Sequence, residues 1–282
     1  MFTTISGKTF DKERSLYNVS NAIINSCVFA GEADGESPLK EAKNIVVNDS
    51  KFSLRYAFWH VDKFEINNSE LSESCRAPLW YCTDGKISNC TIKSIKPLRD
   101  CSNIAIEDSK ISSPEFGWKS SNITLKNTEI EAEYLFLDCK DIELYDVNMK
   151  GKYSFQYLEN LVIKDSHIDT KDAFWHAKNV KVINSYIKGE YLAWFSENVE
   201  FINCIIEGTQ PFCYCKNLVL KDCKMIGTDL AFEYSEVQAT IIGSIDSVKN
   251  PLSGSIIADD IGEIVKEDDL KNGNATIVVR AK

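Results

Sequence analysis

The chain has 282 residues, of which 32 are Lys or Arg and 42 are Asp or Glu, so its formal net charge is −10. This length is enough to bury a substantial core, and the acidic balance argues against binding to DNA, RNA or anionic lipid, which needs an excess of Lys and Arg. No apolar run approaches the roughly 20 residues of a membrane span, and the first residues lack the basic-then-apolar pattern of an export signal. We therefore expect a cytoplasmic protein without nucleic-acid or membrane partners.

One segment precedes the regular part of the sequence, and another interrupts its first repeat. Residues 1–20 are expected to cap the end of an array of repeats, because an exposed core end needs covering. The acidic stretch GEADGESPLKEA (31–42) accounts for a five-residue excess in the first repeat and is predicted to be a loop.

Residues 21–242 repeat the phrase apolar-x-(Asn/Asp)-(Ser/Cys/Thr)-x-apolar, as in IEDSKI and LKDCKM. We call the Asn or Asp of this phrase position zero, and residues at the same offset from it form a column. The differences between successive sequence numbers of position zero are 24, 19 and 21, and then 19 seven times. The eleven copies are Asn25, Asp49, Asn68, Asn89, Asp108, Asn127, Asp146, Asp165, Asn184, Asn203 and Asp222.

The columns around position zero predict a solenoid of β-strands. Two residues before zero and three after it every repeat is apolar, from Ile23 and Val28 in the first copy onward. Five residues before zero a second Asn-rich column recurs, and Asn, Asp and Gly favour turns. Apolar runs of two or three residues between such corners are too short for helices. We predict an all-β, right-handed parallel β-helix of about eleven regular coils with a 19-residue period; a leucine-rich repeat is the competing fold.

Several phrases carry a family resemblance: RAPLWYC, SPEFGWK, KDAFWH and GEYLAWFSENV. With these phrases the chain resembles an uncharacterised bacterial family of right-handed parallel β-helix proteins in the pectin-lyase-like superfamily. The resemblance covers nearly the whole chain. It implies the β-helix fold, and it implies no activity or catalytic residues.

Beyond Asp222 the repeat becomes irregular, through ATIIGSI, GSIIADDIGEIV and ATIVVRA, which we interpret as shorter closing strands. No Pro-rich or Gly-rich linker divides the array. We therefore predict a single domain over residues 1–282, with an N-terminal cap (1–20), regular coils (21–242) and irregular C-terminal coils with a cap (243–282).

The ten cysteines mostly belong to columns. Seven of them stand directly after zero or twelve residues after it, where other coils carry Ser, Thr or Ala: Cys82, Cys90, Cys101, Cys139, Cys204, Cys215 and Cys223. A Cys that interchanges with such residues fills core space, so we expect reduced packing thiols, although stacked pairs such as Cys204 and Cys223 lie within disulfide reach. Cys213-x-Cys215 lacks a second ligand pair, and we predict neither a metal nor a cofactor.

Nine to eleven residues after zero the sequence is rich in aromatic residues. Column nine has no polar residue and is predicted to face the core, whereas column ten holds all five tryptophans. Adjacent residues of a regular strand face opposite sides, so a backbone bend or a covering terminal segment is needed to place columns ten and eleven together outside. If they lie outside, the stripe is a candidate ligand groove. Its residues are Trp59, His60, Trp80, Tyr81, Arg99, Asp100, Trp118, Lys119, Asp138, Gln156, Tyr157, Trp175, His176, Trp194 and Tyr214.

Two interpretations of this stripe remain open. In the first, indole faces stack on sugar rings while the polar centre supplies hydrogen bonds to a glycan or another extended ligand. In the second, the aromatic residues form ladders that stabilise the solenoid, with Asp100, Lys119 and Asp138 as a charge-alternating ladder. We favour a non-catalytic binding or scaffold protein whose partner is an oligosaccharide or a protein, with self-association as a third hypothesis.

The alternative is a carbohydrate lyase or glycosidase in which Arg99, Asp100, Lys119 and Asp138 act as the catalytic residues. Asp100 and Asp138 are two coils apart, about 10 Å at the usual strand spacing, near the upper end of the roughly 6.5–9.5 Å of inverting glycosidases. Lys119 between them favours two ionised carboxylates, which disfavours a general acid. The phrase AFWH, which contains His60 and His176, occurs twice in equivalent positions. Six coils separate the copies, so we do not expect these histidines to share a metal or a proton.

Overall fold

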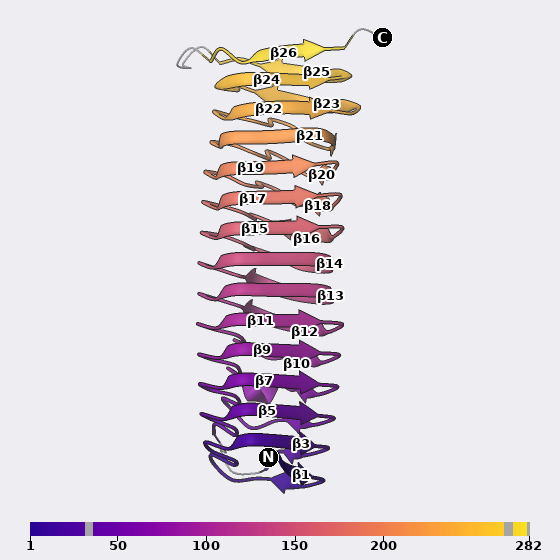
Figure 1. Ribbon diagram of the computed structural model, residues 1–282. Helices are drawn as coiled ribbons and strands as arrows, with labels where there is room; N and C mark the ends of the chain where they lie inside the picture. Colours follow the sequence, from indigo (N-terminus) through magenta and orange to yellow (C-terminus); the bar gives the residue numbers. More distant parts are fainter. Residues whose placement is uncertain (32–35, 268–272, 281–282) are drawn as a thin grey trace. The chain divides into compact units, whose positions relative to one another are not determined.

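The structure is a computed structural model that describes residues 1–31, 36–267 and 273–280. These residues form two compact units, Met1–Glu143 and Leu144–Lys282. Each unit is a parallel β-solenoid, in which every coil adds its strands beside those of the coil before it (Figure 1). Within the described ranges, no helix has the length and hydropathy of a membrane span. The single domain over residues 1–282 stays a prediction.

The described residues of the first unit form strands joined by turns and one 3₁₀-helix, η1 (Glu73–Cys75), which occupies the two-residue insertion between Asn68 and Asn89. β14 (Lys140–Lys152) begins in this unit and continues into the second. The other strands are β1 (Thr3–Ser6), β2 (Thr9–Phe10), β3 (Ser20–Asn25), β4 (Val28–Phe29), β5 (Lys43–Asn48), β6 (Lys51–Phe52), β7 (Asp62–Asn67), β8 (Glu70–Leu71), β9 (Thr83–Ser88), β10 (Thr91–Lys93), β11 (Ser102–Glu107), β12 (Lys110–Phe116) and β13 (Ser121–Leu135).

The second unit is built in the same way, and the closing strands predicted beyond Asp222 are present as β22 to β26. Its strands after β14 are β15 (Glu159–Lys164), β16 (His167–Lys171), β17 (Lys178–Ile183), β18 (Tyr186–Lys188), β19 (Glu197–Ile202), β20 (Ile205–Glu207), β21 (Lys216–Ile226), β22 (Glu236–Ile241), β23 (Ser244–Lys249), β24 (Ser253–Ala258), β25 (Asp260–Val265) and β26 (Thr276–Val279).

The strand register confirms the 19-residue coil in both units. In the first, β11 pairs with β13 so that Ile106 lies beside Leu125, and in the second β17 pairs with β19 so that Val182 lies beside Phe201. All four side chains belong to the column two residues before zero and are at most 1% exposed. The leucine-rich repeat is excluded, because the second apolar stretch of the coil is also a strand that pairs in parallel with the next coil, as β16 pairs with β18.

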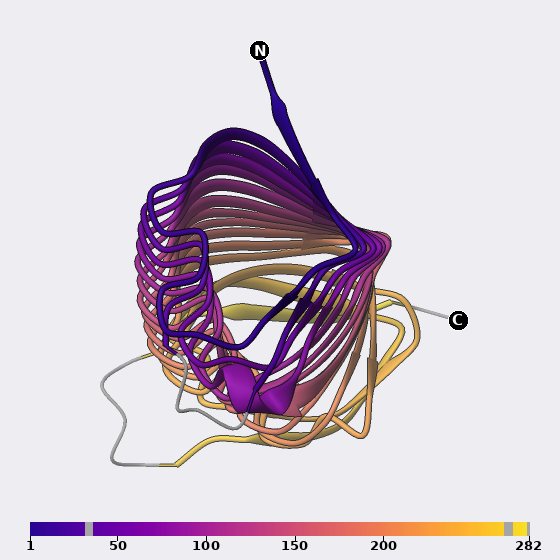
Figure 2. The same ribbon diagram turned by 90° about the horizontal axis from the view of Figure 1, so that it is seen from below.

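The corners are held by left-handed residues and amide ladders. Asn198 and Asn217 have φ values of 56° and 51°, a conformation that Asn adopts more readily than most residues. The Nδ2 of Asn217 donates to Oδ1 of Asn198 at 2.9 Å, and Nδ2 of Asn198 donates to Oδ1 of Asn179 at 3.0 Å. Seen end-on, the corners of successive coils of the first unit, indigo to magenta, lie one over another (Figure 2). The Asn columns of the sequence are therefore corners, as predicted.

The two units together contain about 14 turns, not the eleven regular coils that were predicted. The reason is that the N-terminal segment predicted as a cap is itself a coil, and that the irregular C-terminal coils, predicted in addition to the regular ones, also count. At the N-terminus β1 pairs with β3, so that Ser6 lies beside Asn25 at the same 19-residue spacing. This coil has no Asn or Asp at its corner, which is why the repeated phrase does not mark it.

The first predicted coil is out of register by one residue. Asn25 lies beside Asn48, so Ser26, with φ of 51°, occupies position zero. A shift of one residue exchanges the two faces of a strand: the predicted core residue Val28 is 37% exposed, whereas Phe29 is fully buried. Counting from Ser26 instead of Asn25 shortens the first spacing by one, so its excess over the 19-residue period is four rather than five. Residues 32–35 of the predicted acidic loop lie outside the described residues.

Candidate functional site

The segment that carries the predicted site has left-handed backbone at every second residue. Phe174 and His176 have φ values of 62° and 55°, and the equivalent residues of the other regular coils are also left-handed. Successive side chains therefore do not alternate strictly between inside and outside, as they do in a strand. Ala173 and Phe174 are both buried, Trp175 is half-buried and His176 is exposed. The bend that the sequence required is thus present, and column nine faces the core as predicted.

The column-ten tryptophans form ladders in both units. Trp59 and Trp80 stack with ring centroids 5.1 Å apart, and Trp175 and Trp194 stack with centroids 5.5 Å apart. Each of the five indole N–H groups donates to a backbone carbonyl of the following coil, at 2.7–3.0 Å. Gln156 takes the same place and donates to the carbonyl of Asp172 at 2.9 Å.

The stacking determines which parts of the indole rings a ligand can contact. The facing surfaces of stacked indoles cover one another, and the planes of each stacked pair differ by only 4°. Their outer parts are therefore ring edges. A ligand cannot stack on the covered faces in the way the sequence suggested, so polar groups and ring edges make up the outward surface.

Arg99 interrupts the tryptophan column of the first unit. Its guanidinium carbon lies 5.1 Å from the ring centroid of Trp80 and 4.9 Å from that of Trp118, so the cation is held between two indole rings. Among the residues that the structure describes, no side chain or carbonyl accepts a hydrogen bond from this guanidinium. The coils therefore hold a positive group whose N–H donors are not used within the described chain.

Asp100, Lys119 and Asp138 follow one another in column eleven beside Arg99, and all three are exposed. Their coils are consecutive, since the N–H of Asp100 donates to the carbonyl of Trp118 at 3.0 Å and that of Lys119 to the carbonyl of Leu137 at 3.0 Å. Within the described part of the chain, no ion pair joins Lys119 to either carboxylate. The three groups form a row of exposed charges rather than a closed salt-bridge ladder.

The rest of column eleven is aromatic and stacked. In the first unit His60 and Tyr81 have ring centroids 4.7 Å apart. In the second unit the centroid distances are 5.0 Å for Tyr157–His176, 5.1 Å for His176–Phe195 and 4.7 Å for Phe195–Tyr214. Each histidine thus belongs to a ring stack within its own unit.

Phe195 lies in the same column but is not among the predicted site residues, although its spacing of 19 residues from His176 marks it. The column then continues to Tyr234, whose centroid is 5.5 Å from that of Tyr214, and not to Glu233. An extra residue before this corner shifts the register by one: the N–H of Tyr214 donates to the carbonyl of Glu233.

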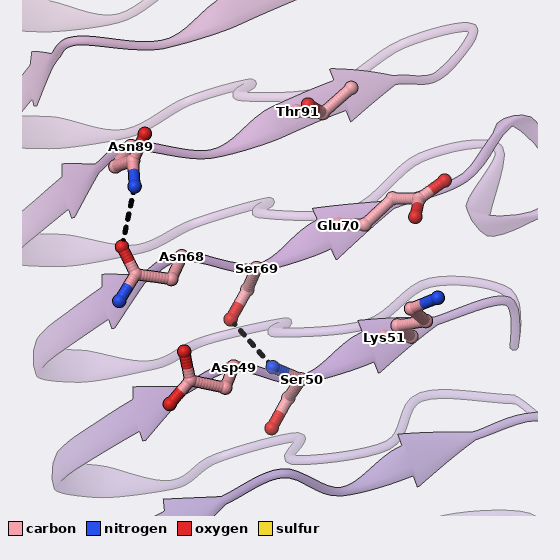
Figure 3. Close-up of a pocket in the computed structure, with 8 residues that line it drawn as sticks. All are labelled: Asp49, Ser50, Lys51, Asn68, Ser69, Glu70, Asn89 and Thr91. Carbon is pink, nitrogen blue, oxygen red and sulfur yellow. Dashed lines mark hydrogen bonds between the residues drawn. The ribbon is translucent and has the colours of Figure 1, made fainter.

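Two hollows on the first unit lie away from the stripe. One, of about 290 Å³, lies along the position-zero corners, where Nδ2 of Asn89 donates to Oδ1 of Asn68 and the N–H of Ser50 donates to Oγ of Ser69 (Figure 3). The other, also of about 290 Å³, lies over Phe64 and Gly85. Neither contains a residue of the predicted site, and sequence columns give no signal for such hollows because they arise between coils. The first is lined by Asp49, Ser50, Lys51, Asn68, Ser69, Glu70, Asn89 and Thr91.

The cysteines are all free and buried. The N–H of Cys82 donates to Sγ of Cys101 at 3.3 Å, much as the N–H of Cys90 donates to Oγ of Ser109 at 3.0 Å, so sulfur takes the place of a hydroxyl between coils. Burial raises the pKa of the Cys139 and Cys215 thiols to about 12. No group of three or more His, Cys, Asp or Glu side chains in the described residues is arranged to hold a metal ion.

The sequence model of a family described as "Protein of unknown function (DUF3737)" matches residues 3–279. The chain belongs to this family. The uncharacterised β-helix family that the sequence resembled is thus confirmed. A search of curated protein sequences finds no match.

Three solved structures are similar to this chain at low identity. The surface adhesin PfbA of Streptococcus pneumoniae is 8% identical, with 86% of this chain and 80% of the adhesin aligned and a TM-score of 0.40. The mannuronan C-5 epimerase AlgE4 A-module of Azotobacter vinelandii is 9% identical, with 100% and 91% aligned and a TM-score of 0.31. Tailspike protein 3 of bacteriophage CBA120 is 11% identical, with 98% and 44% aligned and a TM-score of 0.23. No activity is transferred from likenesses this distant.

Proposed function

We propose that this chain is a non-catalytic binding scaffold and that its first unit recognises an extended, carboxylate-bearing ligand, with acidic oligosaccharides as the ligand class. The observation that carries the proposal is the guanidinium of Arg99 between the rings of Trp80 and Trp118. Its N–H donors have no acceptor among the described residues. A planar, permanently charged donor of this kind matches the geometry of a carboxylate, with which it forms two parallel hydrogen bonds.

The stacking prepares Arg99 for this role. A guanidinium between two indoles gains cation–π attraction on both faces and has lost most of its rotamer freedom before the ligand arrives. Ordering a long side chain on binding costs about 0.5–1.5 kcal/mol, so a pre-ordered arginine keeps more of the hydrogen-bond energy for affinity. The tryptophans on either side thus act as positioning residues, whereas Arg99 makes the contact.

The neighbouring column supplies contacts along an extended ligand. Asp100, Lys119 and Asp138 are exposed on three consecutive coils, and parallel strands repeat every ~4.8 Å. Carboxylates accept hydrogen bonds from sugar hydroxyls, and the ammonium group of Lys119 supplies a second positive charge. Charge and hydrogen bonds, rather than stacking on indole faces, would therefore select the ligand.

The same geometry favours binding over catalysis. Asp100 and Asp138 are both exposed. A glycosidase keeps its general acid protonated by burying it, and neither of these two exposed carboxylates is buried. We therefore favour binding over the lyase or glycosidase alternative, and a cytoplasmic location stays a prediction.

A binding experiment with matched variants tests the proposal. Isothermal titration with trigalacturonate, and with galactotriose as the uncharged counterpart, should show binding of the first and not of the second. Arg99→Trp continues the tryptophan column and keeps the fold while removing the charge, so it should weaken binding by about tenfold or more, as expected for one charged hydrogen-bonded contact.

Lys110→Gln is the control, because it removes one positive charge from a different column, where Lys110 pairs with Glu129 at 3.0 Å. Its affinity for trigalacturonate should stay within about twofold of the unmodified chain, as for a distant surface charge. Equal affinities of Arg99→Trp and the unmodified chain, or equal binding of both trisaccharides, would contradict the proposal.

A further inference from the structure

The second unit carries a ridge of exposed rings that the ligand site on the first unit does not use. We define the ridge as Tyr157, His176, Phe195 and Tyr214, whose centroids are 4.7–5.1 Å apart. Tyr157 is 57% exposed, Phe195 46% and Tyr214 36%, and His176 is also exposed. Soluble proteins rarely expose contiguous apolar surface without a partner.

A row of charges runs beside the ridge, two residues after each ring. It consists of Glu159, Lys178, Glu197 and Lys216, which lie in register on the same four coils. The residue between each ring and its charge is buried, so the ring and the charge both face outward. The signs alternate along the row, in the order acid, base, acid, base.

The ring stacking restricts what can cover the ridge. Because the planes of neighbouring rings differ by only 7–10°, the rings cover one another's faces and present their edges at a repeat of about 5 Å, the spacing of strands in a sheet. A partner that contacts every ring in the same way needs the same repeat. The ridge of a second copy of this chain has the same spacing of about 5 Å between its rings.

We propose that the ridge is an isologous interface between two copies of the chain, with the coils of the two copies running in opposite directions. A two-fold axis across the ridge, between the coils of His176 and Phe195, places Tyr157 opposite Tyr214 of the second copy and His176 opposite Phe195. Such an axis places the same surface of both copies in the interface, as a closed two-fold dimer requires. This inference goes beyond the proposed ligand site and does not depend on it.

The charge row selects this arrangement. Reversing its order places Glu159 opposite Lys216 of the other copy and Lys178 opposite Glu197, so all four charges meet an opposite charge. If the coils of both copies ran in the same direction about an axis parallel to the ridge, the rows would lie on opposite sides of the interface and would not meet. Complementary charges favour one docking mode and penalise the others.

A charge-reversal experiment on the full chain tests the interface. Sedimentation equilibrium over a concentration series should show a monomer–dimer equilibrium. Lys178→Glu places like charges opposite each other twice in the dimer and should raise the dimer Kd by about tenfold or more. The double variant Lys178→Glu/Glu197→Lys restores opposite charges and should return the Kd to within about threefold of the unmodified chain.

Two further variants complete the design. Phe195→Asp puts a charge at the centre of the ridge and should leave a folded monomer, with folding checked by circular dichroism. Lys224→Glu, an exposed lysine of another column, should leave the Kd unchanged. A chain that is monomeric throughout the series, or a dimer that none of the ridge and charge-row variants weakens, overturns the proposal. Weakening by Lys178→Glu without recovery in the double variant overturns the antiparallel arrangement.

Discussion

Trp59 and Trp80 lie on successive coils with their ring centroids 5.1 Å apart and their planes inclined by 4°. Each donates its indole N–H to a carbonyl of the next coil at 2.7 Å. The column of tryptophans is therefore part of what holds the coils together. Arg99 occupies one position of this column, and its guanidinium contacts the rings of Trp80 and Trp118.

The first prediction concerns the tryptophan ladder. Trp175→Ala removes the stack on Trp194 and the hydrogen bond to the carbonyl of Tyr191, so we expect a loss of about 3 kcal/mol in the free energy of unfolding. Trp175→Phe keeps an aromatic rung and loses the indole hydrogen bond, for a cost of about 1 kcal/mol. Urea unfolding followed by circular dichroism measures both. Equal stability of the two variants would show that stacking contributes little.

The second prediction concerns the sheet position where a glycine makes room for a ring. A Cβ added to Gly85 would lie 2.1 Å from Cζ of Phe64, which is itself 2% exposed. Gly85→Ala should therefore destabilise the chain by about 1–3 kcal/mol, as overpacking does. Phe64→Leu removes the clash, so the double variant should be less destabilised than the sum of the single changes. Additive effects in thermal unfolding would contradict this packing.

The third prediction concerns the Asn ladder at the corners. Asn198→Ala loses one hydrogen bond to Asn179 and one from Asn217, and places a Cβ-bearing residue without a polar side chain at φ of 56°. We expect a cost of about 2 kcal/mol from both effects. Asn198→Gly loses the ladder but accepts the left-handed backbone, so its cost should be about 1 kcal/mol. An alanine variant more stable than the glycine variant would refute this division.

The fourth prediction concerns alkaline pH. Burial raises the pKa of the Cys75, Cys139 and Cys215 thiols from 9.0 to about 12. Between these values the unfolded chain has released protons that the folded chain still holds, so the free energy of unfolding falls as pH rises from about 9 to 12. The contribution is fully present below about pH 9.

Urea unfolding at pH 8 and pH 10 measures this change in stability. Other groups also titrate in this range, so a triple Cys→Ala variant at these three positions serves as the reference. Its stability should fall less steeply between the two pH values than that of the unmodified chain. The same slope in both proteins would assign the alkaline loss to other groups.

The sequence predicted most of the fold because the solenoid repeats its environment with a 19-residue period. A position such as Ile106 has equivalents above and below it, and their shared apolar character marks the interior. The prediction failed where repetition gave two equivalent solutions. Asn25 and Ser26 both fit the corner, and the strand register and the burial of Phe29 rather than Val28 distinguish them.

The candidate site was less predictable than the fold. Column alignment placed Arg99 between Trp80 and Trp118, since these three positions follow one another at the 19-residue spacing. The column alignment could not predict the orientation of the rings, because that orientation depends on the left-handed residues at every second position of the turn segment. That conformation turns the indole faces toward neighbouring coils and leaves their edges outside. Stacking on sugar rings was therefore a natural expectation that the backbone does not support.

The most direct test of the proposed ligand site observes Arg99 itself. The chain contains five arginines, Arg14, Arg55, Arg76, Arg99 and Arg280, so a sample labelled with ¹⁵N-arginine gives five Nε–H signals, and Arg99→Trp assigns one of them. On addition of trigalacturonate we expect the Arg99 signal to shift in a saturable way while the other four stay in place. A shift of the other arginines with the Arg99 signal unmoved would contradict the site at Arg99.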